Sequence, residues 1–213
     1  MTEVKICGVT SPDVLDAAAQ SGARFIGFVF APKSPRFIAV EQAAILARRV
    51  PTGVKTVGLF VDPDDDTLKR VTERVPLDMI QLHGKESPTR IQYIKQHYQL
   101  PIIKSIPIAD KTDLGQLQFI EPLVDWILFD AKATGQAMQE GGNGVSFDWN
   151  ILKNYHGKKP WMLAGGLTPE NVKDALAQLS PEAVDVSSGV ESAVGIKDIQ
   201  KIRSFIQAVR NIS

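Results

Sequence analysis

Three side chains able to exchange protons with a substrate each end a short apolar run: Cys7, His83 and Asp130. Thiol, imidazole and carboxyl groups all serve in general acid–base or nucleophilic catalysis. A cysteine among apolar neighbours can also be inert core, and an aspartate before a polar loop can cap a helix, so both alternatives stay open. We expect His83 to be a hydrogen-bonded, orienting residue beside a substrate rather than a metal ligand. With one cysteine, three histidines and no CxxC or HxxH spacing, the sequence predicts no metal site.

Two glycine-containing turns come late in the chain and suit a phosphate group. Gly165 and Gly166 follow one apolar run, and Ser188 and Gly189 follow the next. Bare backbone N–H groups in such turns can surround an anion without a basic side chain. Two ordinary turns would have the same composition, but their positions favour a phosphate-binding site made of these four residues.

Further substrate contacts are expected from two other loops. Arg36 follows the second apolar run, and the fork of N–H donors in a guanidinium suits a carboxylate, although an arginine at the surface is the commoner case. Gly142, Asn143 and Gly144 end the longest loop, which could close over the site as a lid.

These side chains need a scaffold, and the chain alternates strand-like runs with helix-like segments. Runs rich in Val, Ile, Leu and Phe begin about 21–30 residues apart, with one longer gap of about 35 residues, which is the length that a strand–helix–strand unit needs. We predict eight strands, at Val4–Cys7, Phe25–Phe30, Lys55–Val61, Met79–His83, Ile102–Ile106, Trp126–Asp130, Trp161–Ala164 and Ala183–Ser187.

Apolar residues at helical spacing predict helices between these strands, at Asp13–Gln20, Val40–Arg49, Thr67–Val75, Pro88–His97 and Pro169–Leu179. A capping side chain before a proline marks four helix starts, at Ser11-Pro12, Asp62-Pro63, Ser87-Pro88 and Thr168-Pro169. Gly22 stands where the first helix should end.

Strict alternation of eight such units predicts an α/β fold, a single-domain (β/α)₈ TIM barrel over residues 1–213. An open doubly wound sheet is the alternative, but no GxGxxG turn follows the first strand. In a closed barrel the apolar strand face packs on the helices, so polar residues point inward or lie at the C-terminal end. Lys5 and Asp185 then face the interior from neighbouring strands. We predict that they form a structural ion pair, and a separation above about 8 Å would contradict this.

Composition restricts the partners. Lys plus Arg and Asp plus Glu both number 24, so the net charge is zero, and no basic surplus for nucleic acid is present. One cysteine fits a reducing, cytoplasmic compartment. No apolar run approaches the ~20 residues that span a bilayer. No exposed apolar stripe stands out, so we expect a monomer.

The motifs in order resemble those of the phosphoribosylanthranilate isomerase family from the first strand to the eighth. The similarity rests on Lys5-Ile6-Cys7-Gly8-Val9-Thr10, Gly27-Phe28-Val29-Phe30, Lys33-Ser34-Pro35-Arg36, Gln81-Leu82-His83-Gly84, Phe147-Asp148-Trp149, Ala164-Gly165-Gly166-Leu167 and Asp185-Val186-Ser187-Ser188-Gly189-Val190-Glu191.

The resemblance implies a (β/α)₈ barrel without a cofactor that binds a small phosphosugar. Its reaction is the Amadori rearrangement of N-(5'-phosphoribosyl)anthranilate, an aldose–ketose isomerisation in tryptophan biosynthesis. Carried over by position, the general base is Cys7, the general acid is Asp130 and the arginine that holds the anthranilate carboxylate is Arg36. Asp130 would have to hold a proton at neutral pH, and the site or the substrate would have to favour the Cys7 thiolate.

One segment departs from the family pattern. Gly-Gly-Thr-Gly-Lys-Thr before Phe-Asp-Trp is replaced by Gly141-Gly142-Asn143-Gly144-Val145-Ser146, and the preceding loop is long. The departure leaves undetermined which contacts that loop makes with the substrate. It does not affect the residues assigned as acid and base.

Three other functions compete with this one. An isomerase of the histidine pathway, or a relative with both substrates, would have an aspartate in place of Cys7. An indole-forming or carboxy-lyase barrel would need a catalytic lysine, for which Lys104 is the nearest candidate, but the surrounding motif is missing. An inactive barrel kept as a binding module would be expected to lack Cys7, Asp130 or Arg36.

Overall fold

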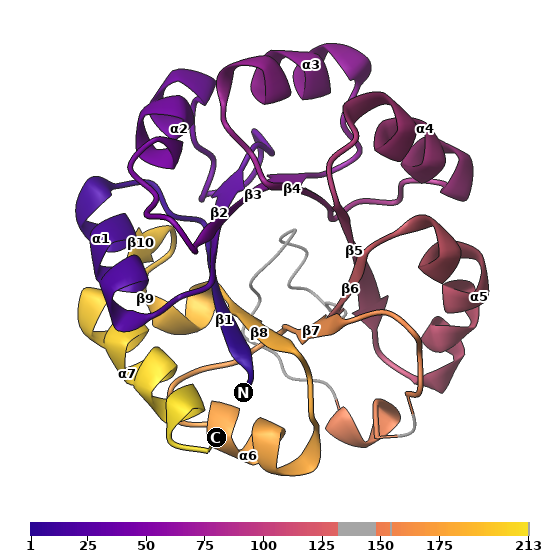
Figure 1. Cartoon of the computed structure of the whole chain (residues 1–213). Coiled ribbons are helices and arrows are strands. Elements are labelled where there is room, and N and C mark those ends of the chain that lie inside the picture. The colour runs from indigo at the N-terminus through magenta and orange to yellow at the C-terminus, as the bar shows by residue number, and fades with distance from the viewer. Residues whose placement is uncertain (132–147, 154, 213) are drawn as a thin grey trace.

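The computed structural model describes residues 1–131, 148–153 and 155–212. In this part of the chain eight parallel strands form a closed barrel in sequence order (Figure 1). They are β1 (Glu3–Cys7), β2 (Phe25–Val29), β3 (Lys55–Phe60), β4 (Met79–Leu82), β5 (Ile102–Ile108), β6 (Trp126–Ala131), β7 (Trp161–Leu163) and β8 (Ala183–Val186). The predicted barrel is confirmed, and every strand boundary lies within two residues of its expected place.

Helices surround the barrel on the outside (Figure 1). They are α1 (Pro12–Ser21), α2 (Val40–Ala47), α3 (Asp65–Arg74), α4 (Pro88–Tyr98), α5 (Leu117–Ile120), α6 (Val172–Gln178) and α7 (Ile199–Arg210). Short 3₁₀ turns are η1 (Lys111–Gln116), η2 (Glu121–Leu123), η3 (Trp149–Ile151) and η4 (Ser188–Val190). A small hairpin of β9 (Glu191–Ala193) and β10 (Ile196–Lys197), which the sequence analysis did not predict, precedes α7. In the described residues, no helix combines the length and the apolar character needed to cross a membrane.

Local sequence explains where several helices begin and end. Ser11 and Ser87 accept hydrogen bonds from Val14 N–H and Arg90 N–H, so the predicted caps of α1 and α4 are confirmed. Gly22 ends α1 with φ of 103°, a left-handed conformation that glycine adopts without strain.

The predicted start of α3 at Asp62-Pro63 is wrong. The helix begins at Asp65 and is capped by Asp64, which accepts from Thr67 N–H at 2.8 Å. Asp62 has a positive φ of 44°, and its carboxylate accepts instead from Lys85 N–H at 2.7 Å. The Asp62 side chain, which the local sequence pattern assigned to the start of α3, therefore binds the loop after β4 instead.

The predicted start of α6 at Thr168-Pro169 is also wrong, because this helix begins at Val172. Thr168 N–H donates to the side-chain oxygen of Asn171 at 2.8 Å, which closes a turn before the helix. The turn joins the glycine loop after β7 to the helix.

Side chains on the strands alternate between two cores, as expected for a barrel. The inner cluster fills the barrel and consists of Phe25, Val57, Met79, Ile103, Leu128, Met162, Ala164 and Ala183. Val4, Ile6 and the other outward residues belong to the cluster shared with the helices. Lys5 and Asp185 pair across β1 and β8, with Nζ 2.9 Å from Oδ1, which confirms the predicted contact.

Candidate active site

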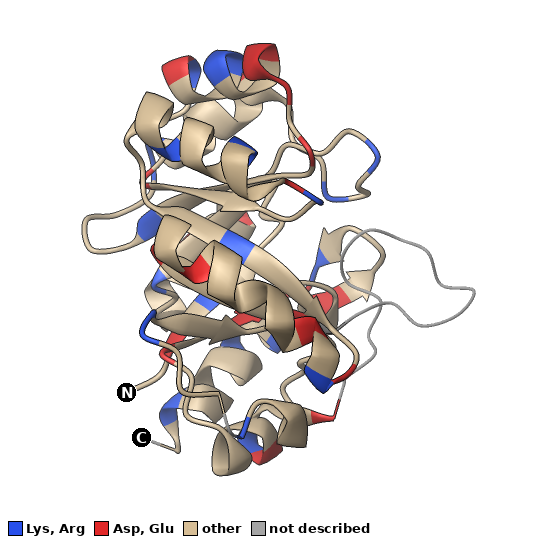
Figure 2. Ribbon diagram, turned by 90° about the vertical axis from the view of Figure 1, so that its right-hand side faces the viewer, with Lys and Arg blue, Asp and Glu red and all other residues tan. Residues whose placement is uncertain are grey.

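The strands bring the three predicted acid–base residues to one end of the barrel. Cys7 is the last residue of β1, His83 follows β4 and Asp130 is the last residue but one of β6. Because all eight strands are parallel, these positions lie at their carboxyl ends. Both termini lie at one end of the molecule (Figure 2). The carboxyl ends of the strands are where TIM-barrel enzymes carry their active sites.

His83 orients Asp130. Its Nε2 lies 3.2 Å from Asp130 Oδ2, and its Nδ1 lies 3.0 Å from the amide nitrogen of Gln81. An amide nitrogen can only donate, so Nδ1 is the acceptor and the imidazole proton is on Nε2, directed at the carboxyl group. Gln81 is fully buried in the barrel. The orienting role expected of His83 therefore has a direct geometric basis.

Cys7 lies in an apolar pocket, only 4% exposed, with Val29, Ala31 and Leu59. Burial raises the pKa of its thiol above the ordinary value of 9.0, while the ammonium groups of Lys5 and Lys197 act to lower it. Burial has the larger effect. Burial thus favours the thiol form, and two cations limit the cost of forming the thiolate.

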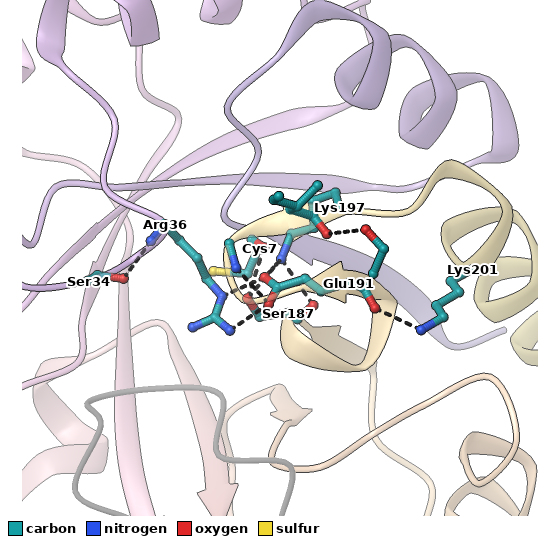
Figure 3. A network of polar contacts seen from close by, with 10 residues as sticks. Cys7, Ser34, Arg36, Ser187, Glu191, Lys197 and Lys201 are labelled. Carbon is teal, nitrogen blue, oxygen red and sulfur yellow. Dashed lines mark hydrogen bonds and ion pairs between the residues drawn. The ribbon is translucent and has the colours of Figure 1, made fainter.

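Arg36 is held by a carboxylate that the sequence analysis did not single out. Glu191, the first residue of β9, accepts from Arg36 Nε at 2.7 Å and from Nη2 at 2.9 Å. Both side chains are buried, and Lys197 on β10 approaches the same carboxylate at 2.6 Å (Figure 3). Burial acts to raise the pKa of Glu191, but the bonds from Arg36 and Lys197 outweigh it and lower the pKa below 4.5.

The same network reaches the backbone of Cys7. Lys197 Nζ donates to Ser187 O at 3.0 Å and to Ser187 Oγ at 3.1 Å. Ser187 Oγ in turn donates to the carbonyl oxygen of Cys7 at 3.2 Å (Figure 3). Burial lowers the pKa of Lys197, whereas Glu191 acts to raise it. The only local signal for this arrangement is that Glu191 lies four residues beyond the predicted strand Ala183–Ser187, on the side of the barrel expected to carry the site.

The two predicted phosphate turns lie against each other. Gly165 and Gly166 have φ of 85° and 66°, which lets the backbone turn without strain. A Cβ on Gly189 would lie 1.8 Å from the carbonyl oxygen of Leu167, so only glycine fits there. Ser188 begins η4 beside it. The structure thus joins the loops after β7 and β8 into one surface of backbone groups.

Two further parts of the sequence analysis concern the long loop and Lys104. Gly142, Asn143 and Gly144, with the lid they were assigned to, lie outside the described residues. Lys104 points away from the barrel interior, since Ile103 beside it fills the inner core, and it pairs with Glu86 at 2.9 Å. No three His, Cys, Asp or Glu side chains come together as a metal site anywhere in the described ranges.

Comparison with known proteins identifies the family. The family model described as N-(5'phosphoribosyl)anthranilate (PRA) isomerase matches residues 4–208. The curated N-(5'-phosphoribosyl)anthranilate isomerase of Paramagnetospirillum magneticum is 51% identical over 208 residues, covering 98% of this chain and 97% of the relative. That of Paracoccus denitrificans is 52% identical over 203 residues, covering 95% and 94%.

Solved structures agree with the sequence matches. The crystal structure of phosphoribosyl anthranilate isomerase from Thermotoga maritima superposes with a TM-score of 0.89 at 35% identity, covering 99% of this chain and 100% of that chain. A further crystal structure of the isomerase, in complex with reduced 1-(o-carboxyphenylamino)-1-deoxyribulose 5-phosphate, gives a TM-score of 0.86 at 34% identity over the same shares.

Proposed function

The chain belongs to the N-(5'-phosphoribosyl)anthranilate isomerase family and is an isomerase of tryptophan biosynthesis, and on that premise we propose that Cys7 is its general base and Asp130 its general acid. The observation that carries this assignment is the arrangement at the end of the barrel. A thiol with two cations near it stands on β1, and a carboxyl group oriented by His83 stands on β6.

The reaction requires one proton to be given and one to be taken. Asp130 protonates the ring oxygen of the phosphoribosyl group, and the bond from that oxygen to C1 breaks to leave an imine. The Cys7 thiolate then removes the proton on C2, and the electrons of that bond form an enamine. Tautomerisation of the enamine gives the 1-amino-1-deoxyribulose 5-phosphate.

His83 supports the acid in this scheme. Its Nε2–H contacts one carboxyl oxygen of Asp130, so the other oxygen is the one that would carry the proton to the substrate. His83 is 16% exposed on its side chain, enough to touch a bound molecule as well. We therefore keep it among the substrate-binding residues.

The remaining contacts are assigned by charge and by backbone geometry. The analogue named in the complex of the related enzyme carries a carboxyphenyl group and a phosphate group. Arg36, fixed by Glu191, suits the carboxylate. Gly165, Gly166, Ser188 and Gly189 suit the phosphate through their backbone N–H groups. Gly142, Asn143 and Gly144 are proposed as further substrate contacts on sequence grounds alone.

A direct turnover assay tests the proposal. Freshly generated phosphoribosylanthranilate is given to the wild type and to Cys7→Ser, with circular dichroism as a check on folding. We expect rapid conversion by the wild type and a loss of kcat of about 10²–10⁴ in the variant. Full activity of Cys7→Ser would remove Cys7 from the role of base, and no conversion by a folded wild type would overturn the assignment as a whole.

We also propose that the protein is a single-domain monomer in the cytoplasm that binds no nucleic acid. Acidic and basic residues are interspersed over the described chain (Figure 2), and the net charge is zero. Exposed Ile45, Tyr93 and Phe119 lie on three different helices. The mass in solution checks the oligomeric state: 23.3 kDa supports a monomer and twice that mass contradicts it. If the protein is a dimer, exposed Val194 and Ile196 on the β9–β10 hairpin are the first candidates for its interface.

A further inference from the structure

We propose that Lys5 is a positioning residue for the reaction: its buried ammonium group lies beside the Cys7 side chain and stabilises the thiolate that acts as base. The inference rests on the proposed role of Cys7. It goes beyond the ion pair with Asp185, which by itself would give Lys5 only a structural role in joining β1 to β8.

The first argument is the position of Lys5 on its strand. Lys5 and Cys7 are two residues apart on β1, so both side chains point into the barrel. Lys5 has no exposed surface at all. A buried ammonium group has three N–H donors, and one oxygen of Asp185 accepts from it at 2.9 Å. The Cys7 thiol also lies close enough to Lys5 for the ammonium group to lower the pKa of the thiol and for the thiolate to raise the pKa of Lys5.

Gly27 on β2 supplies an independent observation. A Cβ on this residue would lie 3.1 Å from Cys7 Sγ and 3.3 Å from Lys5 Nζ. The sulfur and the ammonium group therefore occupy the same small space, which exists because β2 has no side chain there. Both contacts are tighter than most Cβ contacts in proteins, so the pocket has no spare room.

The charges around Cys7 come from three elements. Lys5 lies on β1, Asp185 on β8 and Lys197 on β10. The faces that β2 and β3 direct at the thiol are apolar, with Val29 and Leu59. Two positive groups and one negative group thus surround the sulfur.

Lys5 is the stronger of the two cations for this purpose. Lys197 is held by Glu191 at 2.6 Å and by both oxygens of Ser187. Its ammonium group therefore has three oxygen partners. Lys5 attracts the negative charge of the Cys7 thiolate, and it lowers the pKa of the thiol more than Lys197 does.

Proton removal from C2 of the substrate explains why the Cys7 thiolate needs a cation beside it. The thiol first loses its proton to solvent, and the thiolate then takes the proton from C2 of the substrate and becomes a thiol again. Burial alone makes the anionic form costly, and burial raises the pKa of Cys7 even with Lys5 present. Without Lys5 the thiolate would lie near the carboxylate of Asp185 and lose the cation that lowers its pKa most.

The test is a direct titration of the thiol. Cys7 is the only cysteine in the chain, so the ultraviolet absorbance of its thiolate, measured against Cys7→Ser, reports this residue alone. In Lys5→Met we expect the titration midpoint to rise by about 1–3 pH units, with a parallel shift in the pH profile of kcat/KM. In Asp185→Asn, which keeps an acceptor for Lys5, we expect the midpoint to fall, because a negative neighbour is gone.

The expected shifts have opposite signs, because the thiol titration midpoint rises in Lys5→Met and falls in Asp185→Asn. Damage to the fold would not shift the midpoints of the two variants in opposite directions, so the comparison isolates the electrostatic effect. Lys104→Met is the matched control. It removes another buried lysine from an ion pair with a glutamate, but on the outward face of β5, and should leave the midpoint unchanged.

Midpoints equal to that of the wild type in both folded variants would overturn the inference. If Lys5→Met does not fold, an unchanged midpoint in Asp185→Asn is sufficient to overturn it. Failure of the proposed function is distinguishable, because full activity of Cys7→Ser would reject the base and leave the thiol titrations readable.

Discussion

Glu191 holds the guanidinium group of Arg36 by two nearly parallel hydrogen bonds, from Nε at 2.7 Å and from Nη2 at 2.9 Å. Such a two-point contact fixes the plane of the guanidinium group as well as its position. Because Glu191 occupies one edge, a substrate carboxylate would meet Arg36 on another edge, in a fixed direction. The site is thus organised before the substrate arrives, which reduces the entropy lost on binding.

Replacing the arginine tests its place in binding. Arg36→Met should raise KM strongly and change kcat less, because the lost contact is with a part of the substrate that does not react. Steady-state kinetics over a wide range of substrate concentration measures both constants. Arg203→Met, on the exposed face of α7, is the control and should behave as wild type. An unchanged KM in Arg36→Met would move the carboxylate site elsewhere.

Replacing Asp130, the proposed acid, tests the chemical step. Asp130→Asn keeps the shape of the side chain but has no proton to give, so kcat should fall by about 10²–10⁴ with the fold intact. The measurement is kcat at saturating substrate, with Asp174→Asn on the exposed surface of α6 as the control. Retained activity in Asp130→Asn would show that another group protonates the ring oxygen.

The buried carboxylate of Glu191 predicts a pH-dependent contribution to stability. Its pKa is lowered below 4.5 in the folded protein, mainly because Arg36 and Lys197 overcome the effect of burial. A lowered pKa contributes stability that is present above pH 4.5 and is lost as the pH falls through the folded value.

The variant Glu191→Gln should therefore unfold more easily at neutral pH. We expect a loss of about 3 kcal/mol in the free energy of unfolding, because Arg36 and Lys197 lose their shared charge. Urea denaturation at pH 7 and again below pH 4.5 measures this, and the difference from wild type should shrink at the lower pH. A difference that stays constant across this range would contradict the assigned ionisation.

Gly27 has no side chain, and we predict that adding even one methyl group at this position lowers the activity. Gly27→Ala places a methyl group against Cys7 Sγ and Lys5 Nζ, so both must move and kcat should fall. Gly115→Ala is the matched control, because a Cβ there has no atom within 4 Å. Comparing kcat and the thermal midpoint of both variants checks the prediction, which fails if Gly27→Ala is fully active.

Much of this architecture is predictable from local patterns. Eight apolar runs at regular spacing specify the closed barrel, and alternation along β1 and β8 alone places Lys5 opposite Asp185. The positions of Cys7, His83 and Asp130 at the strand ends also follow from the pattern. The strand ends depend on residues within one strand–helix unit and on the rule that parallel strands share an end, whereas the Lys5–Asp185 pair also depends on closure of the barrel, which makes the first and last strands neighbours.

The parts that could not be predicted depend on bonds between loops. The carboxylate of Asp62 serves the loop after β4 instead of α3, and Asn171 closes a turn that delays α6. The β9–β10 hairpin brings Glu191 and Lys197 to Arg36, from 155 residues away in the case of Glu191. No local pattern contains the partner of such a bond, so these groups become visible only in the folded chain.

The contact between Lys5 and Asp185 spans 180 positions of the sequence and joins the first barrel strand to the last. A polypeptide growing from the ribosome contains Cys7, the proposed base, long before it contains Asp185 and Lys197, the other charged groups around that thiol. Until β8 leaves the exit tunnel, β1 has an unpaired edge and Lys5 lacks its counter-ion. Closure of the barrel and completion of the charges around Cys7 therefore come together, late in synthesis, and until then the open edge of β1 is a site for wrong strand pairing.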